Sequence, residues 1–210
     1  MEGALTSFDR SFGTPSTALR YAASLGRNGD FQLMKRLLLA AALSLLTVTS
    51  APAQTVILVR HAEKADASAD PVLSAAGQAR AFALAVALSD SDLTHIFTSP
   101  LQRTRLTAEL TAQAHAVMPE VFSFEGGTDA HIQRIADRIR ALPADAVVLV
   151  VGHSNTVPLI ARALGETGWS EMADCEYDRL IVVSVEDDGD SPAVIGRYGE
   201  PANCAGNTTG

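Results

Sequence analysis

Short apolar runs alternate with amphipathic stretches from residue 55 onward. Residues 55–60 have a continuous apolar centre at 56–59, and residues 146–151 are apolar throughout. Both patterns are typical of strands buried on both faces. Shorter runs at 95–98 and 121–124 predict two more strands. The most apolar run, 146–151, is expected at the centre of the sheet.

Helical patterns fill the intervals between these strands. They predict helices over residues 75–88 and 101–115, a third between Thr128 and Pro143, and a fourth that ends at about Leu164. Ser74 and Thr128 are expected to be N-cap residues. Ser99 and Pro100 are expected to be the cap and first residue of the second helix.

Two final strands, 180–185 and 193–198, are separated by an Asp-Asp-Gly-Asp turn and should pair antiparallel. Elsewhere strands and helices alternate, which favours parallel pairing. The sequence therefore predicts an α/β fold, a three-layer sandwich with a mainly parallel, mixed sheet. We find no internal repeat, low-complexity tract or interdomain linker.

The chain before this region has the pattern of an export signal. Met34-Lys35-Arg36 precedes an apolar run over residues 37–48, and Ala51 and Ala53 occupy the small positions of a cleavage site. The apolar run is shorter than the roughly 20 residues that span a bilayer. Residues 34–53 are predicted to be a signal peptide cut after Ala53, which leaves no stable membrane span and an exported, periplasmic or secreted protein.

Residues 1–33 lie ahead of a start that Met34 could itself provide. They show scattered turn formers and no clear periodicity. We expect that the reading frame was assigned too far upstream and that this segment is not translated. The alternative is a disordered tail ahead of an uncleaved signal anchor. In either case residues 54–210 form the one predicted domain.

Charge narrows the possible partners. Residues 54–210 hold 11 of the 16 basic and 21 of the 24 acidic residues, a net charge of −10. Nucleic-acid binding needs a basic surface, so nucleic acid is not an expected partner. An anionic substrate would need local positive charge to attract it, because the overall field opposes it.

Cys175 and Cys204 are the two cysteines of the chain, and both follow the predicted signal peptide. In an oxidising compartment such a pair is expected to form a disulfide. The alternative is two free, buried thiols. No histidine lies at a metal-like spacing from either cysteine, so we expect no zinc site.

Three predicted strands end in polar residues that suit phosphate. Arg60-His61 follows the first strand, Ser99-Pro100 with Arg103 follows the second, and Gly152-His153 follows the run at 146–151. The carboxyl ends of parallel strands meet at one edge of a sheet. Guanidinium groups offer paired donors to phosphate oxygens, so the sequence predicts a phosphoryl site at this edge.

These segments resemble the histidine phosphatase superfamily. Residues 58–63 (Leu-Val-Arg-His-Ala-Glu) resemble its Arg-His-Gly signature, and residues 98–104 (Thr-Ser-Pro-Leu-Gln-Arg-Thr) its Ser-Pro-Leu-x-Arg motif. Residues 151–154 (Val-Gly-His-Ser) resemble a third motif, and residues 73–77 (Leu-Ser-Ala-Ala-Gly) a common helix start. The resemblance implies a phosphoglycerate mutase-like fold, in the branch that includes phosphohistidine phosphatases.

The resemblance also implies roles for the matching residues. His61 would attack phosphorus and become a transient phosphohistidine. Arg60, Arg103 and His153 would hold the phosphoryl oxygens and stabilise the charge of the transition state. Neither a metal nor another cofactor is implied.

Two departures leave the proton donor open. Ala62 replaces the glycine of the signature, and Ser154 stands where the acid-phosphatase branch has Asp. The mutase-like branch takes its acid from the interval that here contains Glu109, Glu120 and Glu125. Glu125 is the preferred candidate because it follows a predicted strand; alternatively it is a solvated loop carboxylate.

The predicted function is an exported, metal-independent phosphatase acting on phosphomonoesters or phosphoramidates of small or larger molecules. The alternative is a catalytically inactive module of the same fold that binds a phosphorylated ligand. A mutase is not favoured, because export would remove the enzyme from cytosolic substrates. Loops at residues 65–71, 124–128 and 165–178 are expected to border the site and carry its specificity.

Overall fold

The computed structural model describes residues 53–168, 171–186, 189 and 191–204. The predicted upstream segment and the signal peptide up to residue 52 lie outside the described residues. The described elements are β1 (Gln54–Arg60), α2 (Ala75–Ala87), β2 (His95–Thr98), α3 (Gln102–His115), β3 (Glu120–Val121), α4 (Gly127–Arg140), β4 (Val147–Gly152), α5 (Val157–Ala163), β5 (Arg179–Val185) and β6 (Ala193–Arg197).

The strands of the described region form a single sheet in the order β3-β2-β4-β1-β5-β6. β1 and β2 both pair parallel with β4, whereas β5 pairs antiparallel with β1 and with β6. The mixed sheet and the central position of β4 confirm the prediction. Arg60 pairs with Gly152, and Thr98 with Val151, so the three strands end almost level with one another.

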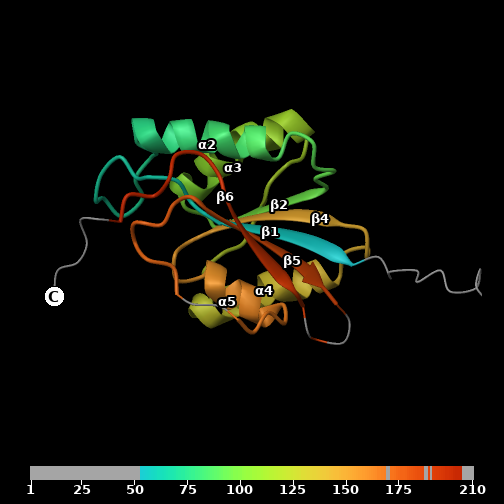
Figure 1. Ribbon diagram of the computed structural model, residues 1–210. Coiled ribbons are helices and arrows are strands. Elements are labelled where there is room, and N and C mark those ends of the chain that lie inside the picture. Colours follow the sequence, from blue (N-terminus) through green and yellow to red (C-terminus); the bar gives the residue numbers. More distant parts are fainter. Residues whose placement is uncertain (1–52, 169–170, 187–188, 190, 205–210) are drawn as a thin grey trace, which may run out of the picture. The chain divides into compact units, whose positions relative to one another are not determined.

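Helices cover both faces of the sheet (Figure 1). α2 and α3 lie on one face, and α4 and α5 on the other. Alternate residues of β1 serve the two layers: Val56 and Leu58 pack with the α4/α5 layer, and Ile57 and Val59 with the α2/α3 layer. Each fully buried aliphatic side chain stabilises the fold by roughly 1.5–3 kcal/mol. The predicted three-layer sandwich is confirmed.

Three predicted boundaries were wrong. β3 is the two-residue strand Glu120–Val121 instead of 121–124, because Val121 already pairs with Thr98, the last residue of β2. α4 begins after Gly126, whose φ of 78° turns the chain into the helix, so Thr128 is not its cap. α3 begins at Gln102, and Ser99 is used elsewhere. Ser74 does cap α2, accepting a hydrogen bond from the Gly77 amide at 3.1 Å.

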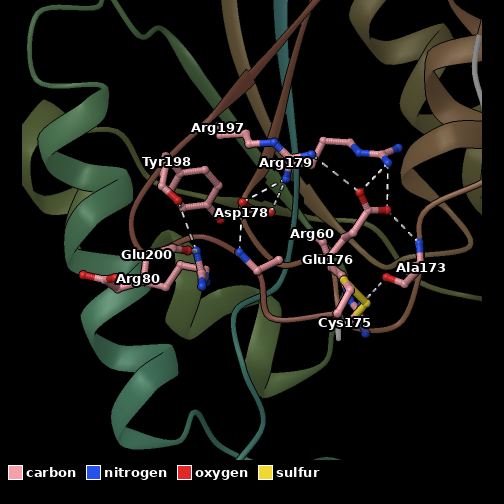
Figure 2. A network of polar contacts seen from close by, with 12 residues as sticks. Arg60, Arg80, Ala173, Cys175, Glu176, Asp178, Arg179, Arg197, Tyr198 and Glu200 are labelled. Atoms are coloured by element: carbon pink, nitrogen blue, oxygen red, sulfur yellow. Dashed lines mark hydrogen bonds and ion pairs between the residues drawn. A yellow bond between two sulfur atoms is a disulfide. The ribbon is translucent and has the colours of Figure 1, made fainter. Parts of the chain in front are cut away.

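The predicted disulfide is confirmed. Cys175 and Cys204 are bonded, with their Cα atoms 5.3 Å apart. The bond joins the turn before β5 to the segment after β6 (Figure 2). The helices of the described part of the chain include none long and apolar enough to cross a membrane.

Candidate active site

The three polar strand exits meet in one cavity of about 320 Å³. Arg60, His61 and His153 form its buried floor and are 3–7% exposed. Arg103 reaches the cavity from the first turn of α3. The structure therefore brings together the four residues that the sequence placed at the predicted phosphoryl site.

Arg60 is held by the turn that precedes β5. One terminal nitrogen, Nη1, donates to the carbonyl oxygens of Ala173 at 3.1 Å and Asp174 at 2.7 Å. The guanidinium carbon lies 4.1 Å from the centre of the Tyr177 ring, within the range of a cation–π contact. This turn fixes the arginine before any ligand arrives.

Both arginines keep a donor for a ligand. The Nε atoms of Arg60 and Arg103 are buried and have no hydrogen-bond partner among the described residues. A buried donor without a partner is costly, on the order of 1–3 kcal/mol. Oxygen atoms of a bound phosphoryl group would satisfy both donors, so this pair of atoms fits an anion site.

His61 continues the chain from β1 and presents one ring nitrogen as a base. Nδ1 lies 2.8 Å from the carbonyl oxygen of Ala62, so the proton is assigned to Nδ1 and the lone pair to Nε2. Burial, followed by the charges of Arg60 and Arg103, lowers the pKa of His61 to about 4. The ring is therefore neutral at neutral pH, as a nucleophile requires.

His153 is oriented by a hydroxyl from another strand exit. Its Nε2 lies 3.0 Å from Ser99 Oγ, which is itself 2.9 Å from Thr104 Oγ1. Burial is the main cause that lowers the pKa of His153 to about 3, and the neighbouring His61 adds to it. Ser99 thus serves the site instead of capping α3.

Close packing fixes the backbone around the two histidines. A Cβ on Gly152 would approach Thr156 Oγ1 to 2.9 Å, and the same oxygen accepts a hydrogen bond from the His153 amide at 2.9 Å. On the other side of the site, Thr107 Oγ1 accepts from the Ala62 amide at 2.9 Å and donates to the Arg103 carbonyl at 2.7 Å. These threonines join the strand exits to α5 and α3.

Glu125 is exposed and does not line the cavity, although its neighbour Phe124 does. The sequence pattern did not indicate three contributors to the site: Asp174, Lys64 and the contact of Ser99 with His153. Lys64 directly follows the first motif, which could have suggested it. Asp174 lies in an irregular loop, where no periodic signal identifies it.

Charge inside the cavity opposes the acidic character of the domain. Arg60, Arg103 and Lys64 line it together with one carboxylate, Asp174. This is the local positive charge that an anionic substrate was expected to need. Within the described ranges, no group of three or more His, Cys, Asp or Glu side chains is arranged to hold a metal ion.

Comparisons with known proteins agree with this geometry. The model of the histidine phosphatase superfamily (branch 1) matches residues 56–123, which contain the first two motifs. No sequence among the curated proteins matches the chain. His153 lies beyond the matched segment, and the structure places it beside His61.

Solved structures with the same fold include a mycobacterial glucosyl-3-phosphoglycerate phosphatase in complex with VO3 (TM-score 0.56, 16% identity, 70% of this chain and 100% of that chain). The protein histidine phosphatase SixA with tungstate is similar (TM-score 0.52, 19% identity, 70% and 96%). So is an Escherichia coli protein assigned as an alpha-ribazole-5'-P phosphatase (TM-score 0.55, 16% identity, 71% and 98%).

At these identities the structural likeness is one of fold. The sequence match covers the segment that carries the first histidine and both arginines, and the fold completes the site with the second histidine. Residues 56–123 are therefore similar to the histidine phosphatase superfamily (branch 1).

Proposed function

We propose that the protein is an exported, metal-independent phosphatase that hydrolyses phosphomonoesters or phosphoramidates through a phosphohistidine at His61. The family match and the fold support a phosphatase. The observation that carries the proposal is the arrangement of a neutral, buried His61 beside two arginines whose Nε donors lack partners. That arrangement suits a nucleophile facing a phosphoryl group.

The first step is an in-line attack. His61 Nε2 forms a bond to phosphorus while the bond from phosphorus to the leaving group breaks. Arg60 and Arg103 donate to the phosphoryl oxygens, where charge develops in the transition state. His153 also donates to the phosphoryl group. Ser99 Oγ donates a hydrogen bond to His153 Nε2, so the proton of the imidazole ring is on Nδ1.

In the second step water attacks phosphorus and the bond to Nε2 breaks, which releases inorganic phosphate and regenerates His61. The hydrogen bond from Nδ1 to the Ala62 carbonyl holds the ring in one orientation through both steps. It also stabilises the positive charge that the ring acquires as Nε2 is phosphorylated. The protein's own groups thus supply the nucleophile and the charge stabilisation.

One assay tests activity and mechanism together. Turnover of p-nitrophenyl phosphate in the presence of EDTA is measured for the parent protein, His61→Ala and His95→Ala. His95 lies at the opposite end of β2 and is the matched control. We expect EDTA to have no effect, and only His61→Ala to lose turnover. Turnover lost in EDTA would contradict metal independence.

Trapping identifies the intermediate. Brief incubation with ³²P-labelled substrate followed by acid-free denaturation should leave label on the parent and none on His61→Ala. Binding of inorganic phosphate without turnover above the His61→Ala level would instead favour a binding module.

Export is part of the proposal and has its own support and test. The signal-like sequence ends at Ala53, and a disulfide such as Cys175–Cys204 persists in oxidising compartments. An intact-mass spectrum of the exported protein should show Gln54 at the amino terminus. A chain beginning at another residue would contradict the predicted cleavage.

A further inference from the structure

A phosphatase for ordinary esters needs a proton donor for the leaving group, and the cavity offers few carboxylates. Glu63 is engaged in a two-pronged ion pair with Arg80. Glu125 lies outside the cavity. Among the described residues that line it, Asp174 is the one acid.

Hydrogen bonds and the disulfide hold the backbone around Asp174 in place. Its carbonyl oxygen and that of Ala173 both accept from Arg60 Nη1. The Ala173 amide donates to Glu176 Oε2 at 2.9 Å, and the same carboxylate accepts from Arg179 Nη2 at 2.6–2.7 Å. The disulfide begins at the next residue, Cys175 (Figure 2).

The side chain of Asp174, in contrast, is free to reach a ligand. It is 83% exposed. One oxygen, Oδ1, lies 3.6 Å from Arg60 Nη2 and 3.4 Å from Ser154 Oγ. Both contacts are long, and both partners line the cavity. The backbone of Asp174 is therefore held in place, whereas its side chain can still change conformation when a substrate binds.

The exposures of His61 and Asp174 place the carboxyl group on the open side of the cavity, toward which a leaving group would depart. His61 is on the buried floor, at 3% exposure, whereas Asp174 is at the open mouth. In an in-line displacement the leaving oxygen is opposite the attacking nitrogen, so it points from the floor toward the mouth. Arg60, Arg103 and Lys64 are the charged groups that share the cavity with Asp174.

We propose that Asp174 is the general acid of this site, an inference that rests on the proposed function. As His61 Nε2 bonds to phosphorus and the P–O bond breaks, the Asp174 carboxyl transfers its proton to the leaving oxygen and an alcohol departs. The resulting carboxylate then takes a proton from the water that attacks the phosphohistidine. Inorganic phosphate leaves, and Asp174 is again protonated.

The test compares substrates that differ in their need for a proton. Glycerol phosphate has a poor leaving group, whereas p-nitrophenyl phosphate releases a stable phenolate. A general acid contributes on the order of 10²–10⁴-fold. In Asp174→Asn, kcat for glycerol phosphate should therefore fall by about that factor. The factor by which kcat for p-nitrophenyl phosphate falls should be at least ten times smaller. Its retained folding is checked by circular dichroism.

Two further variants sharpen the comparison. Asp145→Asn removes an exposed carboxylate at the opposite end of β4 and is the matched control. Glu125→Gln tests the competing donor.

The outcomes separate the two proposals. Equal losses for both substrates in Asp174→Asn, no loss at all, or a selective loss in Glu125→Gln instead would each overturn the role of Asp174. So would a parent that hydrolyses p-nitrophenyl phosphate but not glycerol phosphate, since it would have no effective donor. A parent that hydrolyses neither overturns the proposed function, and the general acid with it.

Discussion

The imidazole rings of His61 and His153 lie edge to face, with their centroids 5.3 Å apart. A positive charge on one ring therefore raises the free-energy cost of a positive charge on the other. Burial is the larger cause of both low pKa values, about 4 for His61 and about 3 for His153. The free site holds two neutral rings over most of the pH range.

The first prediction concerns the pH dependence of kcat/KM, which reports ionisations of the free enzyme. In the proposed mechanism only neutral His61 attacks phosphorus, so activity should fall as the pH drops through about 4. An ordinary histidine would give this limb near 6.5. p-Nitrophenyl phosphate is the substrate, with its own ionisation measured separately. A limb centred near 6.5 would show that His61 is not desolvated.

The second prediction concerns stability. Unfolded histidine binds a proton near pH 6.5, whereas folded His61 and His153 do so only near pH 4 and 3. Between these limits the unfolded state binds more protons, so stability is lost as the pH falls from about 6.5 toward 4. The slope is at most about 1.4 kcal/mol per pH unit for each histidine. Urea unfolding at several pH values measures it.

Replacement of His61 provides the control for that slope. His61→Gln removes one of the buried histidines whose pKa is lowered, so the dependence of the free energy of unfolding on pH should become less steep by about the contribution of one histidine. An unchanged slope in this variant would assign the acid sensitivity to other groups.

The third prediction concerns Ser99, whose hydroxyl contacts His153 Nε2. Ser99→Ala should lower kcat by roughly 5- to 30-fold, the equivalent of 1–2 kcal/mol, because the ring loses its orienting partner. Ser91→Ala removes a hydroxyl that bonds to Leu88 at a distance from the site and serves as the control. Since Ser99 acts through His153, its loss should add little in a His153→Ala background.

The fourth prediction concerns the contact between α2 and the first motif. A Cβ on Gly77 would lie 2.3 Å from the Glu63 carbonyl oxygen, an atom that also accepts from the Ser74 amide at 2.9 Å. Gly77→Ala should lower the free energy of unfolding by about 1–3 kcal/mol. Helix propensity alone would raise it by up to about 1 kcal/mol. An increase would therefore contradict the tight contact.

The fifth prediction concerns the disulfide. Cys175→Ser with Cys204→Ser should lower the free energy of unfolding by about 3–4 kcal/mol, the loop-entropy value for residues 29 apart in sequence. Inhibition by inorganic phosphate should also weaken, because the bonded turn holds Arg60. The control adds both serine substitutions to Arg60→Ala, where they should leave inhibition by phosphate unchanged. If inhibition weakened further in that background, the turn would act on the site by a route other than Arg60.

The parts of the site that follow buried strands could be predicted from sequence. Continuous apolar runs identify β1 and β4, and strand pairing then brings Arg60, His61 and His153 to one edge. Ser99 was misassigned because a Ser-Pro pair is also a common helix start, and only the tertiary structure shows its contact with His153. Asp174 could not be predicted, since its place depends on contacts across the fold.

The predicted start of α4 and the predicted length of β3 were wrong for a similar reason. Thr128 has the composition of a cap, yet the left-handed conformation of Gly126 turns the chain into α4 two residues earlier. β3 ends at Val121 because that residue pairs with Thr98, the last residue of β2. Local propensity does not report such limits, which neighbouring elements impose.

The pairing of β1 has a consequence for synthesis. β1 leads directly to His61, the proposed nucleophile, yet its two neighbours in the sheet, β4 and β5, begin only at Val147 and Arg179. A growing chain emerges amino terminus first and folds by domains, so Arg60 and His61 exist long before their neighbours do. The proposed site is therefore incomplete in every growing chain until β4, His153 and the turn that holds Arg60 have been made.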